Sequence, residues 1–170
     1  GVEMIDGVNA FDFATIESAI TRSRPDVVIN AVGVIKQLAG AKDVVQSLTI
    51  NSILPQRLGE LASAGEFRFI HVSTDCVFDG EKGSYKETDT PNALDLYGQS
   101  KHWGEVTGPN CLTLRTSIIG RELGSSHSLI DWFLSNRGKR VKGYSNAIYS
   151  GFPTIVFADI IRDLITQSAE

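Results

Sequence analysis

Three hydrophobic segments of the chain have the pattern of buried β-strands. Residues 24–34 open with Arg-Pro-Asp and continue as an unbroken β-branched run, and residues 66–75 and 110–120 repeat the pattern. Apolar runs of this length are typical of strands that are covered on both faces, as in a parallel sheet. We therefore predict three buried strands at these positions.

Helical patterns separate these strands. Residues 12–23 have apolar positions at 13, 16, 19 and 20, and residues 51–65 have them at 53, 54, 58, 61 and 62, on one helical face. Gly65 predicts the end of the second helix. Further helices are predicted at 96–108, 128–136 and 156–169. Strands and helices that alternate in this way form βαβ units, so we predict a doubly wound α/β domain whose mostly parallel sheet carries helices on both faces.

The length of 170 residues fits one domain with a real core. Residues 79–95 are polar and rich in turn residues, which predicts a loop and not a linker between domains. Residues 138–154 mix strand-like and turn-like pieces. Because residue 1 is Gly and the first residues look like the end of a strand, we expect an upstream segment to precede them.

Composition and charge narrow the classes of partner. The formal net charge of -4 gives no electrostatic reason to expect a nucleic acid or an anionic membrane surface. No apolar stretch reaches the length of a membrane span, and the start has no signal-peptide pattern. Cys76 and Cys111 form neither a disulfide framework nor a metal spacing, and the histidines show no HxxxH spacing. We expect a cytoplasmic protein with no metal site.

The candidate chemistry lies in two short stretches, "HVSTDCVFDG" at 71–80 and "LYGQSKHWGE" at 96–105. On a helix, Tyr97 and Lys101 share a face, and a cation beside a phenol favours the ionised phenol. Ser73 and Thr74 end a predicted strand, where an open α/β sheet binds its ligands. A Tyr-xxx-Lys spacing is weak by itself, but here it follows a strand that ends in hydroxyls, so we predict a proton-transfer site.

These stretches resemble the extended short-chain dehydrogenase/reductase family, and most closely its sugar-nucleotide reductases of the dTDP-4-dehydrorhamnose reductase type. The resemblance covers nearly the whole chain in the family's order and spacing. The segments that carry it are "RPDVVINAVG", "TINSILPQRLGELA", "HVSTDCVFDGEKGSYKETDTP", "YGQSKHWGE", "LRTSIIG" and "FPT". It implies a Rossmann-like domain over 1–170, truncated at both ends, with residues 138–154 contributing to the substrate side.

The resemblance also implies roles for individual residues. Tyr97 is implied as the proton donor, Lys101 as the residue that holds the nicotinamide ribose and tunes Tyr97, and Thr74 as the ligand of the substrate oxygen. Asp75 and Cys76 are implied as neighbours of the substrate; from its position, Asp75 could equally well stabilise its own turn. The implied cofactor-binding set comprises Asn30, Ala31, Val32, Gly33, Asn51, Ser73, Tyr97, Lys101, Thr116 and Ser117. Asn9 or Asp12 is expected near the adenine.

The implied function is the NAD(P)-dependent reduction of a nucleotide-linked 4-keto-6-deoxy sugar in the synthesis of cell-surface polysaccharide precursors, with a homodimer as the expected assembly. Both NAD and NADP stay open. The sequence lacks the GxxGxxG turn that binds pyrophosphate, so we expect the 170-residue chain to bind the cofactor poorly. The alternatives are a sugar-nucleotide epimerase or dehydratase and a non-catalytic regulatory subunit that binds nucleotides. The related dehydratases have a Glu where this chain has Cys76.

Overall fold

The structure is a computed structural model that describes residues 2–36, 42–123 and 128–167. It divides into two compact units, Gly1–Arg115 and Thr116–Glu170. A single domain over 1–170 stays a prediction.

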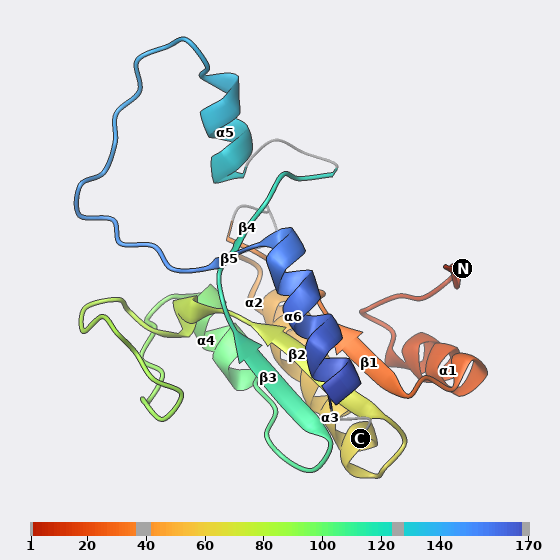
Figure 1. Ribbon diagram of the computed structural model, residues 1–170. Coiled ribbons are helices and arrows are strands. Elements are labelled where there is room, and N and C mark those ends of the chain that lie inside the picture. The colour runs from red at the N-terminus through yellow and green to blue at the C-terminus, as the bar shows by residue number, and fades with distance from the viewer. Residues whose placement is uncertain (1, 37–41, 124–127, 168–170) are drawn as a thin grey trace. The chain divides into compact units, whose positions relative to one another are not determined.

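A three-stranded parallel sheet organises the first unit (Figure 1). Strand β2 (Arg68–Ser73) lies in the centre, between β1 (Val27–Asn30) and β3 (Cys111–Arg115). The strands predicted at 24–34 and 66–75 are confirmed with shorter bounds. The third predicted strand ends at Arg115, and Ile118–Ile119 forms a separate strand, β4, in the second unit.

Helices flank the strands of the first unit in the predicted alternation. Helix α1 (Phe13–Ser23) begins after Asp12, whose side chain accepts a hydrogen bond from the Ala14 amide. A continuous helical stretch then comprises α2 (Val44–Leu48), a π-helical turn at Thr49–Ile53 and α3 (Leu54–Ser63). The predicted start at 51 was wrong, because Asp43 caps the helix eight residues earlier through the Gln46 amide.

The hydrophobic core of this unit lies between α3 and the sheet. It is formed by Phe13, Leu54, Leu58, Ala62, Phe67, Phe69 and Val106, all of which are buried. Phe69 projects from β2 and Leu58 and Ala62 from one face of α3, in agreement with the predicted apolar face of that helix. This packing fixes the central strand, whose carboxyl end carries the candidate site.

Helix α4 (Leu96–Trp103) follows the loop at 79–95, which is tied together by its own side chains. Asp79 accepts hydrogen bonds from Tyr85 and Asn92, and Lys82 pairs with Asp89 at 2.7 Å. The loop predicted at 79–95 from its polar residues is therefore held together by its own hydrogen bonds and ion pair.

The second unit contains β4, β5 (Phe152–Pro153) and the helices α5 (Leu129–Ser135) and α6 (Thr154–Gln167). The two short strands pair in parallel, with Ile118 opposite Phe152. The helices predicted at 128–136 and 156–169 correspond to α5 and α6, although residues 168–169 lie outside the described part of the chain.

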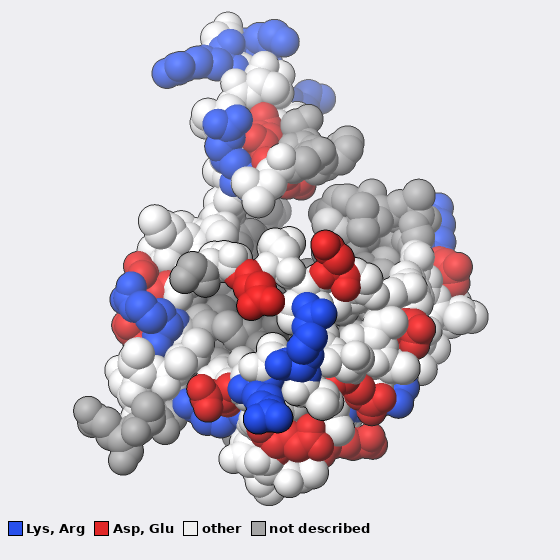
Figure 2. All heavy atoms as spheres, turned by 90° about the vertical axis from the view of Figure 1, so that its right-hand side faces the viewer, with Lys and Arg blue, Asp and Glu red and all other residues white. Residues whose placement is uncertain are grey.

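Charged side chains of both signs lie on the face of the molecule that Figure 2 shows, among uncharged residues that cover most of it. This distribution agrees with the small net charge of -4. Within the described residues, no helix is long and apolar enough to cross a membrane.

Candidate active site

The carboxyl end of β2 carries the first part of the candidate site. Thr74 follows the strand in an extended conformation and caps a short 3-10 helix, Asp75–Val77, because its hydroxyl accepts a hydrogen bond from the Cys76 amide at 3.1 Å. The same hydroxyl donates to Asp75 Oδ1 at 3.3 Å. Thr74 is 6% exposed, so its side chain is held at one place at the edge of the sheet.

Helix α4 carries the second part. Asp95 caps the helix by accepting a hydrogen bond from the Gly98 amide at 3.0 Å. Gly98 is buried against the strand-end turn, where a Cβ atom would collide with the carbonyl oxygen of Cys76 and with Ala93. The absence of a side chain at position 98 thus lets the first turn of α4, which contains Tyr97, approach the Thr74 turn directly.

Lys101 lies one helical turn beyond Tyr97 and is almost completely buried. It is 4% exposed, and its Nζ donates a hydrogen bond to the carbonyl oxygen of Val72 at 2.8 Å. Burial lowers the pKa of Lys101 to about 8, while the negative charge of Glu105 acts in the opposite direction. The ammonium group is therefore directed at the carboxyl end of β2, where Val72 directly precedes Ser73.

The pKa of Tyr97 is raised, which contradicts the expectation that Lys101 would bring it down. Burial is the largest cause, the hydrogen bond with Thr74 acts in the opposite direction, and the charges of Cys76, Asp75 and Asp95 raise the pKa further. A phenol with a raised pKa holds its proton at neutral pH. In this structure Tyr97 is thus suited to donate a proton, and it lies within reach of the Thr74 hydroxyl.

A partly buried ion cluster next to Ser73 was missed by the sequence analysis. Glu105 accepts two hydrogen bonds of 2.7 Å from Nε and Nη2 of Arg115 and one of 2.8 Å from the Ser73 hydroxyl. Burial acts to raise the pKa of Glu105, but hydrogen bonds from Arg115, Ser73 and His102 outweigh it, and the pKa lies below its usual value. The hydroxyl of Ser73 joins β2 to this cluster, and the expected contact of Ser73 with the cofactor stays a prediction.

Asn30 ends β1 next to a buried histidine. Its Nδ2 lies 3.2 Å from Nδ1 of His71, and its Oδ1 accepts a hydrogen bond from the Val32 amide at 3.1 Å. Burial, together with the charge of Lys101, lowers the pKa of His71 to about 3, so the imidazole is neutral. Asn30 therefore shapes the turn of Ala31, Val32 and Gly33 that leaves the strand.

Asn51 joins three segments from the π-helical turn. Its Oδ1 accepts from the Val34 amide at 2.8 Å, and its Nδ2 donates to the Val34 carbonyl oxygen at 3.0 Å and to the Ser100 hydroxyl at 3.1 Å. Turns of this type inside α-helices are frequent at functional sites. Asn51 thus connects the segment after β1 to helix α4. Its partner on α4, Ser100, lies between Tyr97 and Lys101 in the sequence.

Thr116 and Ser117 lie at the start of the second unit. The hydroxyl of Thr116 donates to the Ser117 carbonyl oxygen at 2.9 Å, and that oxygen also accepts from the Phe152 amide at 3.0 Å. Their expected contact with the cofactor stays a prediction.

A family model described as "RmlD substrate binding domain" matches residues 4–170. The chain belongs to this family. Among characterised relatives, dTDP-4-dehydrorhamnose reductase from Aggregatibacter actinomycetemcomitans is 36% identical over 132 residues, which are 70% of this chain and 45% of that protein. Methionine adenosyltransferase 2 subunit beta from Xenopus tropicalis is 34% identical over 104 residues, which are 58% of this chain and 29% of that protein.

Solved structures confirm the Rossmann-like α/β fold class of this RmlD-family chain. The crystal structure of a hypothetical dTDP-4-dehydrorhamnose reductase from Sulfolobus tokodaii has a TM-score of 0.82 and 29% identity, and the match covers 98% of this chain and 62% of that one. A dTDP-4-dehydrorhamnose reductase from Bacillus anthracis, solved in complex with NADP, has a TM-score of 0.80 and 20% identity, with coverages of 94% and 59%. The chain spans about half the length of the curated reductases that it matches.

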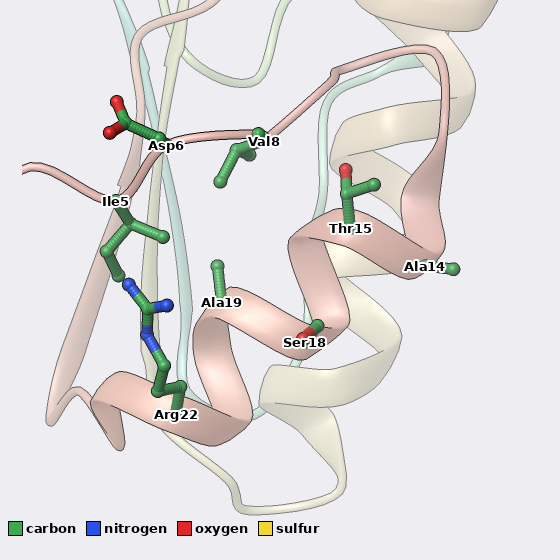
Figure 3. A pocket seen from close by; sticks show the side chains of 9 residues that line it. Ile5, Asp6, Val8, Ala14, Thr15, Ser18, Ala19 and Arg22 are labelled. Atoms are coloured by element: carbon green, nitrogen blue, oxygen red, sulfur yellow. The ribbon is translucent and has the colours of Figure 1, made fainter.

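The RmlD-family chain also has a surface pocket at its N-terminal end (Figure 3). It is lined by Ile5, Asp6, Gly7, Val8, Ala14, Thr15, Ser18, Ala19 and Arg22. Asn9 and Asp12, expected near an adenine, are engaged in the start of α1: the Asn9 amide donates to Thr15 Oγ1 at 2.9 Å, and Asp12 caps the helix. An adenine contact of either residue stays a prediction.

The described residues contain no group of three or more His, Cys, Asp or Glu side chains that could hold a metal ion. Both cysteines are free and half-buried.

Proposed function

We propose that the protein reduces a nucleotide-linked 4-keto-6-deoxy sugar with NADH or NADPH. The observation that carries the proposal is the pairing of the Thr74 hydroxyl with the phenol of Tyr97, which shares a helix face with the buried Lys101, in a chain of the RmlD family. A carbonyl oxygen placed between the two hydroxyls would accept hydrogen bonds from both once the Thr74 hydroxyl turns its single proton from Asp75 Oδ1 to the ligand. This arrangement supports proton donation to the oxygen of a keto sugar.

The nicotinamide end of a cofactor fits the residues around Lys101. An ammonium group has three N–H donors, and one of them is used by the Val72 carbonyl oxygen. Within the described part of the chain, the Val72 carbonyl oxygen is the one hydrogen-bond acceptor of Lys101, so we expect the other two donors to bind the diol of a ribose. The exposed turn at Ala31 and Val32 offers a surface along which a dinucleotide would lie.

Each residue of the site has a separate task in this reaction. A bound reduced nicotinamide supplies the hydride that the keto carbon receives. Tyr97 gives its proton to the oxygen of the former carbonyl, and Thr74 holds that oxygen in line with the phenol. Lys101 holds the ribose, and Asp75 and Cys76 line the substrate side.

A dehydratase on the same fold is the first competing function. Dehydration of a hexose nucleotide requires a further acid and base beside the keto carbon, and the related dehydratases have a Glu directly after the Thr-Asp pair. This chain has Cys76 there, and a thiol is a poor replacement for a carboxylate in acid–base catalysis. The side chain at position 76 therefore favours reduction.

A regulatory subunit is the second competing function, and the similarity to methionine adenosyltransferase 2 subunit beta favours it. A binding subunit has no need of a phenol, a buried ammonium and a hydroxyl in one arrangement. The retention of Thr74, Tyr97 and Lys101 supports the enzyme.

The full-length protein, incubated with NADPH or NADH and a nucleotide-linked 4-keto-6-deoxy sugar, tests the proposal. We expect the reduced-nicotinamide absorbance to fall in proportion to the sugar consumed, and mass spectrometry to find a product heavier by two hydrogens. A product lighter by one water from an unmodified hexose nucleotide, without net cofactor consumption, would replace the reductase by a dehydratase. Absence of both reactions, with tight binding of a partner protein, would favour the regulatory subunit.

The cellular setting belongs to the same proposal. We propose a cytoplasmic homodimer in the synthesis of cell-surface polysaccharide precursors, with residues 138–154 on the substrate side. Light scattering of the full-length protein measures the assembly, and a mass of one chain would exclude the dimer.

A further inference from the structure

Lys36 reaches from the segment after β1 to the beginning of helix α4. Its Nζ lies 3.0 Å from Oδ2 of Asp95 and 5.5 Å from the centroid of the Tyr97 ring. Asp95 is also the N-cap of the helix, since its other oxygen accepts from the Gly98 amide. One carboxylate thus holds the first turn of α4 and a lysine from a different segment of the fold.

This ion pair contributes little to folding. The side chains of Lys36 and Asp95 are 49% and 52% exposed, and exposed pairs are screened by water and salt. The position of this ion pair matters more than its contribution to stability. The Lys36 ammonium lies within the range of a cation–π contact with Tyr97, which we assign as the proton donor.

We propose that Lys36 is a positioning residue for Tyr97, which holds the phenol ring in place and compensates the carboxylate at the start of α4. The inference rests on the proposed function. It goes beyond that function because Lys36 lies outside the Thr74, Tyr97 and Lys101 set.

Charged and titratable groups approach Tyr97 from three elements. They are Asp75 and Cys76 on the 3-10 helix, Asp95 and Lys101 on or next to α4, and Lys36 after β1. The charge of Asp95 is one of the causes that raise the pKa of Tyr97. Removal of Lys36 leaves that carboxylate without its cationic partner, so the phenol becomes harder to ionise.

The direct test is the titration of Tyr97 by NMR of the full-length protein with ¹³C-labelled tyrosine, in which Tyr97→Phe identifies the signal. We expect Lys36→Met to raise the Tyr97 pKa by about half a unit, and Lys36→Arg to keep the wild-type value. Added salt should reduce the difference. An unchanged Tyr97 pKa in Lys36→Met would overturn the proposal.

A second variant shows whether the effect passes through Asp95. Asn is as good an N-cap as Asp, so Asp95→Asn preserves the helix start while it removes the charge. We expect Asp95→Asn to lower the Tyr97 pKa, and Lys36→Met to have a smaller effect in that background. Equal effects of Lys36→Met in both backgrounds would overturn the role assigned to Asp95.

Lys82 provides a matched control. It pairs with Asp89 at 2.7 Å and lies 5.7 Å from the centroid of the Tyr85 ring, so it has the same kind of surroundings in the loop at 79–95. Lys82→Met should leave the Tyr97 pKa unchanged. An equal shift in this variant would show that Lys36 acts only through net charge, and would overturn the proposal.

Kinetics separate this inference from the proposed function. If Tyr97 donates the proton, activity is lost as the pH rises through its pKa, so Lys36→Met should move the alkaline limb of kcat/KM upward by the NMR shift and leave cofactor affinity unchanged. The NMR shift without any turnover would support the placement of Lys36 and refute the reductase. Turnover with an unchanged Tyr97 pKa and an unchanged alkaline limb of kcat/KM would support the reductase and overturn the role assigned to Lys36.

Discussion

Burial controls the protonation of the residues that carry the candidate chemistry. Lys101 is 4% exposed, and burial lowers its pKa from 10.5 to about 8. The same effect raises the pKa of Tyr97, which therefore keeps its proton. The site holds a phenol as the acid and an ammonium that loses part of its charge only above neutral pH.

The Lys101 pKa predicts a dependence of stability on pH. Between pH 8 and 10.5 the unfolded chain binds a proton at Lys101 that the folded chain has released, so the free energy of unfolding rises with pH in that window. Lys101→Met should abolish this rise and stabilise the protein at pH 7 by roughly 1–2 kcal/mol. This net value already includes the loss of the hydrogen bond from Lys101 to the Val72 carbonyl oxygen.

Urea unfolding of the wild type and Lys101→Met at pH 7, 8.5 and 10 measures both effects. The variant should also lose turnover and bind the cofactor more weakly, which shows that the buried charge serves function. A wild type whose stability follows that of the variant at all three pH values would contradict the pKa of about 8.

At the scale of elements, the contact between α4 and the end of β2 decides whether Thr74 and Tyr97 meet. Gly98 permits this contact, because a Cβ atom there would collide with the Cys76 carbonyl oxygen. Gly98→Ala should therefore displace the first turn of α4 and lower kcat at least ~10-fold, since small misplacements at a reacting centre are costly. Kinetics of the full-length protein measure the loss.

Gln99→Ala is the control for this substitution, because it changes the next residue of the same helix. The Gln99 side chain donates only an exposed 3.5 Å hydrogen bond to the Leu94 carbonyl oxygen, so the variant should keep the wild-type kcat. A Gly98→Ala enzyme with wild-type kcat would show that the helix does not have to approach the strand end so closely.

The sequence predicted the helices and strands better than the side-chain contacts that hold them. The strands and helices followed from the local periodicity of apolar residues. The assignment of Thr74, Tyr97 and Lys101 rested on the Tyr-xxx-Lys spacing and on the resemblance to a known family. The pairing of Glu105 with Arg115 and Ser73 joins residues 10 and 32 positions apart. No local pattern encodes such partners, which is why the sequence did not reveal this cluster or the pairing of Lys36 with Asp95.

At the scale of the whole molecule, the chain matches the family over residues 4–170 but spans about half the length of the curated reductases. Its 170 residues contain no GxxGxxG turn, whose backbone amides bind the pyrophosphate of a dinucleotide. We expect the 170-residue chain to bind NAD(H) or NADP(H) weakly. Calorimetry that gives a low-micromolar Kd would contradict this expectation.

The most direct test of the central claim is the turnover of the full-length Tyr97→Phe variant with a nucleotide-linked 4-keto-6-deoxy sugar. Phe keeps the ring beside Lys36 and removes only the hydroxyl that meets Thr74. We predict a kcat at least ~100-fold below the wild type with an unchanged Kd for the cofactor, which is the loss expected for general acid catalysis. A variant that retains most of the wild-type kcat would contradict the assignment of Tyr97 as the proton donor.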